Sequence, residues 1–392
     1  MAAVHTALRR HALDGWLFAG GRTPDPALGA VFRVAPPAHV TRPWMYFVPA
    51  DLAPIRVVHA LEPAALDGLP GQSWVYHSRE QWQKAVAALV EGHENIAVQW
   101  SPRGAIPAAD ILPAGWMELL RDAGAVPSPS APLLGELAAL SPVELAGHER
   151  AADILTRAVR ETLEWLGRRA AGGHRITERA VQAALMERAV AAGLALPDPP
   201  IVAFGEHTAD PHYAIGSAGD TDLAPGDLVL VDAWGREAAA GSIYADLTWM
   251  AIAAEEPSHE AGQLFAILCA ARDQAVAVIN SSAQAGKVLT GADVDRLVRG
   301  LLEPTDHHQY FPHRTGHSLG TEVHGIGVNL DSLESDDDRA LVPGTVFTIE
   351  PGIYLPGRMG LRTEINVALA ADGRSARVTT APWQDRLACL LA

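Results

Sequence analysis

The sequence contains only 2 cysteines among its 392 residues, Cys269 and Cys389. Both stand in apolar, helix-like contexts, so we expect buried thiols in a reducing compartment rather than a disulfide framework. Basic residues are also scarce, since 30 Lys and Arg face 46 Asp and Glu and leave a formal net charge of −16. This balance argues against binding to nucleic acid, which requires a basic surface.

Long apolar runs are missing as well. No run approaches the roughly 20 residues that span a membrane, and the first 16 residues lack the apolar core of a signal peptide. The patterns HExxH, GxxxxGK[ST] and CxxC are absent, which removes the common signatures of zincins, P-loop enzymes and thiol sites. We therefore expect a soluble, cytoplasmic, acidic globular protein with no nucleic-acid or membrane partner.

What the chain does have is enough length and apolar content, 48% hydrophobic residues, for two domains. Residues 1–135 alternate short apolar runs with helical patterns, which predicts an α/β domain. Residues 136–170 predict a linker and a connecting helix, because Ser141-Pro-Val-Glu144 is a capping box with proline at the first helical position. Residues 171–392 then form the second domain.

The second domain is predicted to be α+β. Helices are expected after Thr177 and at 258–279 and 291–302, where glycines and capping residues bound apolar periodic segments. Strands are expected at 200–204, 227–233, 242–252, 344–355 and 360–369. Two blocks of helices with strands suggest a pseudo-symmetric layered structure.

Residues 311–325 contain three histidines and three glycines, FPHRTGHSLGTEVHG. Glycines at this density allow the backbone to approach a ligand closely. The histidines His313, His317 and His324 offer neutral nitrogens to a metal or act as acids and bases near neutral pH. This segment is the first candidate for a functional site.

Four isolated acidic residues stand in apolar strand-like contexts: Asp232, Asp246, Glu350 and Glu364. A carboxylate in a buried strand is costly unless a partner neutralises it. If the strands of Asp232 and Asp246 pair as a hairpin, the two side chains meet on one face and repel unless a cation lies between them. The alternatives are a turn aspartate for Asp232 and exposed edge-strand glutamates for Glu350 and Glu364.

His317, between Gly316 and Gly320, is the natural fifth ligand. Oxygen-rich sites with one imidazole suit Mn(II), Co(II), Zn(II) or Fe(II). Four carboxylates balance two divalent cations, and paired metals are a recurrent arrangement for activating water in hydrolysis. Two other candidates are weaker: His307-His308 are adjacent and rarely converge, and residues 336–338 lack the spaced acidic pattern of a calcium loop.

The phrases around these residues carry a family resemblance. ADPHY at His212, YADLT at Asp246, HRTGHSLG at His317, EPGIY at Glu350 and LRTE at Glu364 resemble the pita-bread dinuclear metallopeptidases. That family includes methionine aminopeptidases, aminopeptidase P and prolidase (Xaa-Pro dipeptidase). The resemblance covers the chain from about residue 201 onward. The separate N-terminal domain resembles the creatinase/prolidase branch, which implies a creatinase-like α/β domain followed by a pita-bread catalytic domain.

The resemblance implies a role for each residue. Asp246 and Glu364 would bridge two divalent ions (Mn, Co or Zn), Asp232 would hold one ion, and His317 with Glu350 the other. A water between the ions would become hydroxide near neutral pH, with Glu350 as general base. The remaining site residues follow the same resemblance: His324 as donor to the tetrahedral intermediate, His212 for the substrate backbone, His313 and Arg314 in the substrate pocket, and Arg362 as partner of Asp232 or Asp246.

The implied activity is hydrolysis of the Xaa-Pro bond in dipeptides or short proline-containing peptides, by a protein that is expected to be a homodimer. The sequence departs from the dipeptidase pattern at HGIGV, where Gly325 and Val328 stand in place of a glutamate and a carboxylate-binding arginine. The alternatives are therefore aminopeptidase P activity on longer peptides, a catalytically silent peptide-binding protein, and hydrolysis of non-peptide substrates such as organophosphates as a side activity.

Overall fold

The computed structural model describes residues 1–22, 25–34, 40–216 and 219–392. The chain folds into two compact units, Met1–Ala138 and Ala139–Ala392. The predicted boundary after residue 135 lies close to this division. Each unit has its own sheet and its own hydrophobic core.

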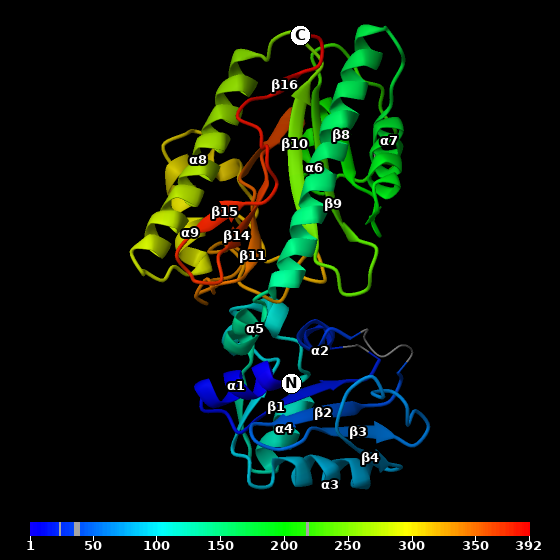
Figure 1. Cartoon of the computed structure of the whole chain (residues 1–392), viewed down its shortest axis with the longest axis vertical. Coiled ribbons are helices and arrows are strands. Elements are labelled where there is room, and N and C mark those ends of the chain that lie inside the picture. The colour runs from blue at the N-terminus through cyan, green and yellow to red at the C-terminus, as the bar shows by residue number, and fades with distance from the viewer. Residues whose placement is uncertain (23–24, 35–39, 217–218) are drawn as a thin grey trace. The chain divides into compact units, whose positions relative to one another are not determined.

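The N-terminal unit is an α/β layer structure, as the alternation of apolar and helical segments predicts (Figure 1). Its six strands run in the order β4-β3-β2-β1-β5-β6. Helices α3 and α4 pack on the sheet through residues such as Val86, Leu89, Met117 and Leu120. The elements are α1 (Ala2–Arg10), β1 (Gly15–Gly20), α2 (Pro26–Phe32), β2 (Trp44–Pro49), β3 (Ile55–His59), β4 (Gln72–Tyr76), α3 (Arg79–Val90), β5 (Asn95–Val98), α4 (Ala114–Asp122), β6 (Val126–Pro129) and α5 (Ala131–Leu137).

The C-terminal unit is α+β. Strands β16, β10, β9 and β7 form one sheet to which β8 adds by pairing with β9; β11-β14-β15 form a second sheet, and β12-β13 a ribbon. The elements are α6 (Pro142–Ala171), α7 (Glu178–Ala191), β7 (Leu194–Ala195), β8 (Ile201–Phe204), β9 (Leu228–Glu237), β10 (Ala245–Ile252), α8 (His259–Gln284), α9 (Gly291–Leu302), β11 (Val346–Ile349), β12 (Gly352–Leu355), β13 (Met359–Arg362), β14 (Ile365–Leu369), β15 (Ala376–Val378) and β16 (Ala388–Cys389).

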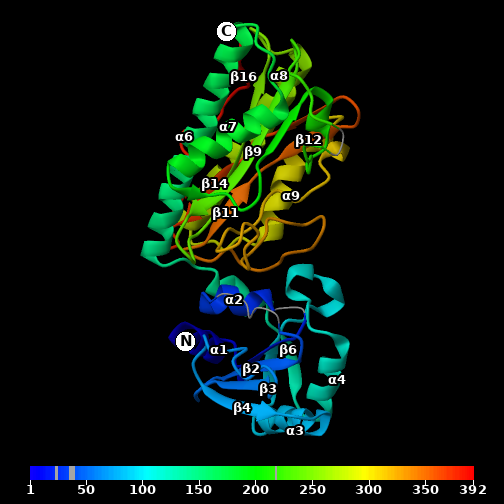
Figure 2. The same ribbon diagram turned by 90° about the vertical axis from the view of Figure 1, so that its right-hand side faces the viewer.

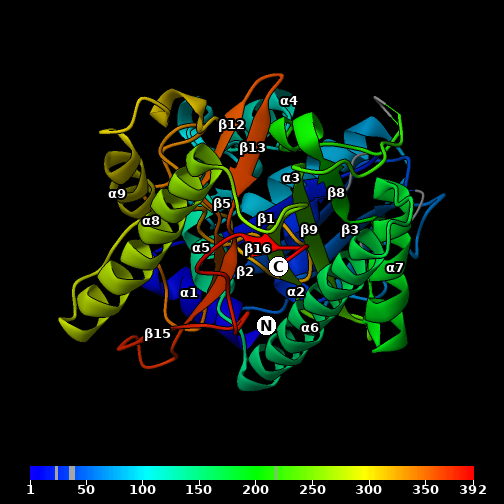
Figure 3. The same ribbon diagram turned by 90° about the horizontal axis from the view of Figure 1, so that it is seen from above.

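The long helix α6 begins at the predicted capping box, in which Ser141 and Glu144 cap each other's backbone N–H groups. It belongs to the C-terminal unit, where it lies beside α7 and packs on β9 and β10 (Figures 2 and 3). The predicted connecting helix within residues 136–170 thus lies in the C-terminal unit. The reason is that the apolar face of α6, with Ala151, Leu155 and Val159, is fully buried.

Alternation along β9 and β10 positions acidic side chains toward a cavity. In β9 the odd-numbered residues Val229, Val231 and Ala233 pack against α6 and α7. The even-numbered Leu228 and Leu230 join the core under α8 on the opposite face. Since side chains alternate along a strand, Asp232 continues that second face. The strand extends to Glu237, so Asp232 lies in its middle rather than at its end.

The last two predicted strands form one long antiparallel hairpin with a break in each strand. β11 pairs with β14 up to Ile349 opposite Ile365, and β12 pairs with β13 from Gly352 opposite Arg362. Residues 350–351 and 363–364, between these segments, lie outside the two strand pairings, although Thr363 N still donates to Pro351 O at 3.3 Å. Pro351 lacks the backbone N–H that a continuous ladder needs at this point. Glu350 and Glu364 therefore stand at corresponding positions on the two sides of the hairpin.

Helix α8 is long and apolar enough to cross a membrane by length and composition alone. In this unit it is a core helix. Leu264, Phe265 and Leu268 are buried together with residues of the second sheet and the ribbon. In Figures 1 and 3 it lies with α9 on one side of the strands, and α6 and α7 lie on the other.

A buried histidine of α6 makes the stability of this unit depend on pH. His148 Nδ1 and Nε2 lie 2.7 Å from Tyr244 O and Thr379 Oγ1. Burial lowers the pKa of His148 from 6.5 to about 4. The neutral ring is favoured in the fold, so its contribution is complete above pH 6.5 and is lost as pH falls toward 4.

We expect the difference in unfolding free energy between the wild type and His148→Gln to shrink on acidification. The interval from pH 7 to pH 4 should remove roughly 3 kcal/mol of the wild-type advantage. Urea unfolding of both proteins at several pH values measures this difference. A difference that stays constant over the interval would contradict the assignment.

Candidate active site

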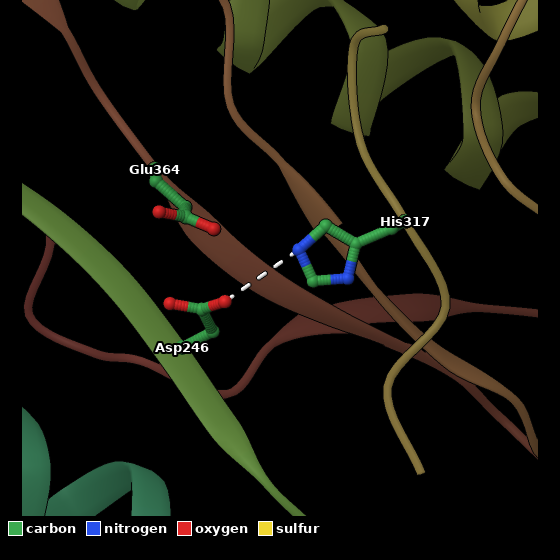
Figure 4. Close-up of side chains that lie close together, drawn as sticks. All are labelled: Asp246, His317 and Glu364. Atoms are coloured by element: carbon green, nitrogen blue, oxygen red, sulfur yellow. Dashed lines mark ion pairs between the residues drawn. The ribbon is translucent and has the colours of Figure 1, made fainter. Parts of the chain in front are cut away.

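Three predicted ligands converge in the C-terminal unit. One ligand atom each from Asp246, His317 and Glu364 lies within 4.8 Å of the other two, and all three residues are buried. Figure 4 shows the two carboxylates and the imidazole pointing toward one another, with His317 Nε2 3.5 Å from Asp246 Oδ2. They come from β10, from the glycine-rich segment and from the break before β14.

Glu350 joins this group through backbone pairing. Residues 315–319 run alongside β11: Glu350 N donates to Thr315 O at 2.7 Å, and Thr348 N donates to His317 O at 2.9 Å. A side chain at Gly316 would place its Cβ 2.0 Å from Thr348 O, so glycine is required for this approach. As a result His317 Nε2 lies 3.4 Å from Glu350 Oε1.

Asp232 lies on the same sheet face as Asp246 but is held by a different partner. Arg362 Nη2 pairs with Asp232 Oδ2 at 2.5 Å. Thr248 lies opposite Asp232 in the β9–β10 pairing. Its hydroxyl is 3.1 Å from Asp232 Oδ1 and 2.7 Å from Glu364 Oε2, and it accepts a hydrogen bond from Arg362 Nε at 2.8 Å. Thr248 therefore connects Asp232 to the cluster of three.

The pKa values of the four carboxyl groups are shifted from their usual ranges. Burial raises the pKa of Asp246 to about 7, and repulsion from Asp232 adds to this effect. Burial and repulsion from the other three carboxylates raise the pKa of Glu364 well above its usual range. Burial also raises the pKa of Asp232, although Arg362 opposes the shift. For Glu350 burial is outweighed by His317 and other cations, which lower its pKa.

The donor set fits divalent metal ions. Among the described residues none donates a hydrogen bond to Asp246 Oδ1, which is buried. An acceptor without a donor inside a protein is costly, and a cation removes that cost. Carboxylates with a single imidazole are the ligand types that such ions prefer. The residues that would hold the ions are Asp232, Asp246, His317, Glu350 and Glu364.

These side chains open into a cavity of about 230 Å³. The predicted residues His212, His324, His313, Arg314 and Arg362 all line it. The His324 ring meets that of His317 edge-on, with the centroids 4.5 Å apart. Desolvation and repulsion from His317 lower the pKa of His324 to about 4, although the residue as a whole is exposed. His324 is thus a neutral imidazole near pH 7.

His313 and Arg314 have different surroundings within the cavity. His313 Nε2 is 2.9 Å from the hydroxyl of Tyr354, and burial lowers the pKa of this histidine. The backbone N–H of Arg314 donates to Glu334 Oε1 at 3.1 Å. No side chain or carbonyl among the described residues accepts a hydrogen bond from the Arg314 guanidinium. Arg314 is therefore a cation available to a bound molecule.

The loop that carries His212 is held by a fully buried carboxylate, Glu178. Its Oε2 accepts from the hydroxyl of Tyr213 at 2.7 Å, and its Oε1 lies 2.8 Å from His207 Nδ1. Its oxygens also accept backbone N–H groups of Phe204 and Thr221. His212 itself is exposed at the cavity, next to the anchored Tyr213.

Sequence reasoning missed several residues of this site. Thr248 and Thr348 could have been found, because each lies two positions from a carboxylate on the same strand face. Apolar lining residues had no such signal: Ile201, Pro211, Trp234 and Val323. Val328 was expected at the position of a carboxylate-binding arginine, yet it is buried in the core and does not line the cavity.

A sheet-lined cavity with buried carboxylates and a histidine, in a layered α+β unit that follows an α/β unit, defines a class of hydrolytic enzymes with the pita-bread fold. A sequence profile described as metallopeptidase family M24 matches residues 146–371. The chain belongs to this family of peptidases. The predicted fold and family resemblance are thereby confirmed.

Individual relatives agree with this placement. The chain is 31% identical over 334 residues to a probable dipeptidase PepE of Mycobacterium tuberculosis, covering 83% of this chain and 80% of that protein. The crystal structure of dipeptidase PepE from Mycobacterium ulcerans matches with a TM-score of 0.73 and 28% identity, over 99% of this chain and 96% of that one. An Xaa-Pro dipeptidase from Bacillus anthracis shares the fold, with a TM-score of 0.67, 20% identity, and coverage of 99% and 98%.

Thr348 provides a test of how the ligands are oriented. Its hydroxyl accepts the N–H of His317 at 3.0 Å and lies 3.1 Å from Glu350 Oε1. Thr348→Val keeps the shape and removes both contacts, so metal affinity should fall about 10–100-fold. Titration calorimetry with Mn²⁺ or Zn²⁺ measures the loss. Thr345→Val is the matched control, since the Thr345 hydroxyl bonds only Val342 O among the described residues and Thr345 lies outside the cavity. Equal affinities of both variants would contradict the role of Thr348.

Proposed function

We propose that this protein is a dinuclear-metal peptidase that hydrolyses the Xaa-Pro bond of dipeptides or short peptides. The observation that carries the proposal is the convergence of Asp246, His317 and Glu364, which are all buried, with Glu350 beside His317 and Asp232 joined to Glu364 through Thr248. Asp246 Oδ1 in this group has no donor among the described residues. Four carboxylates match the charge of two divalent ions. The similarity to proteins described as dipeptidases, one of them an Xaa-Pro dipeptidase, supports the substrate class.

Two divalent ions held by these five residues would make a water molecule acidic enough to attack at neutral pH and would polarise the scissile carbonyl. Glu350 is suited to accept the proton of the attacking water and to deliver it to the proline nitrogen as the C–N bond breaks. Its position at the strand break lets the carboxylate reach into the cavity while its backbone N–H stays bonded to Thr315 O.

His324 and His212 bring imidazole groups to the same cavity. A neutral imidazole keeps one N–H, and in His324 this N–H can stabilise the oxygen that becomes negative as water adds to the carbonyl. His212 is placed to orient the substrate backbone because its loop is fixed through Tyr213 and Glu178. The apolar side chains of Trp234, Val323 and Ile201 supply a surface for the pyrrolidine ring or its neighbour.

Arg314 is the residue that we assign to the C-terminal carboxylate of the substrate. Its guanidinium has no acceptor among the described residues and lines the cavity. A bidentate arginine–carboxylate contact is strong and directional. Since Val328 lies in the core, the absence of an arginine at that position leaves the cavity unchanged. Dipeptides with a free carboxylate are therefore the preferred substrates in this proposal.

The metal requirement gives the first test. The purified protein should bind two divalent ions per chain and lose peptidase activity on chelation, and its melting temperature should fall because the emptied carboxylates repel one another.

His324→Ala should keep both ions but lower kcat about 10²–10³-fold. Glu350→Gln should lose activity and weaken metal binding, because it removes both the base and a charged ligand. Full activity in metal-free protein would overturn the proposal, and loss of an ion from His324→Ala would make that residue a ligand.

The C-terminal group of the substrate, carboxylate or amide, gives the second test. We expect Xaa-Pro to be hydrolysed with a kcat/KM at least about tenfold above that of Xaa-Pro-amide, and Arg314→Met to abolish this difference mainly through KM. Equal rates for the acid, the amide and longer Xaa-Pro peptides would move the assignment to aminopeptidase P. Binding of such peptides without hydrolysis in the metal-loaded protein would indicate a silent peptide-binding protein.

A further inference from the structure

Helix α9 carries an ion pair between Arg299 and Asp295. Arg299 binds the chain segment that precedes His317, the proposed metal ligand. Arg299 Nε donates to the fully buried Asp295 at 2.8 Å. Arg299 Nη1 donates to Phe311 O at 3.1 Å, and Nη2 donates to His313 O. The guanidinium carbon also lies 4.4 Å from the centroid of the Phe311 ring. One arginine thus fixes two alternate carbonyls immediately before Arg314.

Asp295 fixes the chain on the other side of Arg314. Its Oδ1 accepts from the N–H and the hydroxyl of Thr315 at 2.9 and 2.6 Å. Its Oδ2 accepts from the N–H and the hydroxyl of Ser332 at 2.8 and 2.6 Å. Ser332 lies two residues before Glu334, whose Oε1 accepts the backbone N–H of Arg314. A single carboxylate therefore anchors both segments that carry the charged groups at the cavity rim.

The direction of the Arg314 side chain depends on this anchoring. Its guanidinium has no acceptor among the described residues, so no partner of its own defines where it points. The backbone residues on both sides, His313 and Thr315, are instead bonded to α9. Asp295 and Arg299 do not line the cavity, so any effect on a bound peptide must pass through the residues they hold.

We propose that Asp295 and Arg299 are positioning residues that aim Arg314 into the cavity and thereby set the preference for peptides with a free C-terminal carboxylate. The inference rests on the proposed peptidase function and on the carboxylate contact of Arg314. A displacement of about 1 Å in a group that positions the substrate is enough to cost up to about 100-fold in efficiency. The pair acts as one unit, because a charge-assisted bond joins its two members.

The test uses Arg299→Gln, because the Arg299 side chain is partly exposed and its replacement leaves the buried Asp295 with four donors. We expect kcat/KM for Xaa-Pro to fall about 10–100-fold through KM, while kcat/KM for Xaa-Pro-amide stays unchanged. Arg296→Gln is the matched control on the same helix. Arg296 pairs with Asp293 and Asp336 and makes no bond to residues 311–315, so this variant should behave as the wild type.

A double variant separates positioning from general damage. In an Arg314→Met background, Arg299→Gln should cause no further loss, because the group it positions is gone. Equal losses for the acid and the amide, or independent losses in the double variant, would overturn the inference. A wild type that does not discriminate acid from amide would overturn the carboxylate contact and with it the specificity role.

Hydrogen–deuterium exchange of the metal-loaded protein without substrate tests the anchoring itself. Arg299→Gln should speed exchange of the amides in residues 313–316 by at least about tenfold, with α8 and the N-terminal unit unchanged. Unchanged exchange in that segment would overturn the positioning role whatever peptides are hydrolysed. Failure of the anchoring and failure of the proposed peptidase function are thus read from different measurements.

Discussion

The mutual repulsion of four carboxylates in a desolvated cavity is the constraint on which the rest of the C-terminal unit depends. Asp232, Asp246, Glu350 and Glu364 are brought together by two sheets, and burial alone would favour their neutral forms. Arg362 neutralises one of these charges, that of Asp232, through an ion pair of 2.5 Å. In the proposed function, divalent metal ions would neutralise the remaining charge, and a fold with such ions would tolerate so costly a cluster.

The site is built in two layers with different origins. The ligands come from paired backbone: from β10, from residues beside β11 and from the breaks in the final hairpin. The rim groups Arg314 and Glu334 come from loop segments that are held by side chains of α9. The positions of the candidate ligands depend mainly on backbone pairing, with help from Gly316 and Thr348, whereas the rim depends on side chains such as Asp295 and Arg299.

This division also explains what the sequence could predict. The family, the α+β class and the strands that bear the carboxylates were predictable, because an isolated acid in an apolar strand stands out from its period-two pattern. The roles of Glu178 and Asp295, each of which accepts several hydrogen bonds, were not predictable. Each lies in a helical segment where an acidic residue is ordinary, and only the tertiary fold brings the hydrogen-bond donors to these carboxylates. Val328 was misplaced for the same reason, because a position within a motif does not determine which way a side chain faces.

The matching breaks at residues 350–351 and 363–364 divide the final hairpin into two segments. In the first segment β11 and β14 belong to the second sheet, and in the other the β12–β13 ribbon brings Arg362 to the cavity. Arg362 is bonded in turn to Asp232 of β9 and Thr248 of β10. The end of the ribbon is therefore joined to the strands that carry Asp232 and Asp246, so that a change in the ribbon reaches these carboxylates directly.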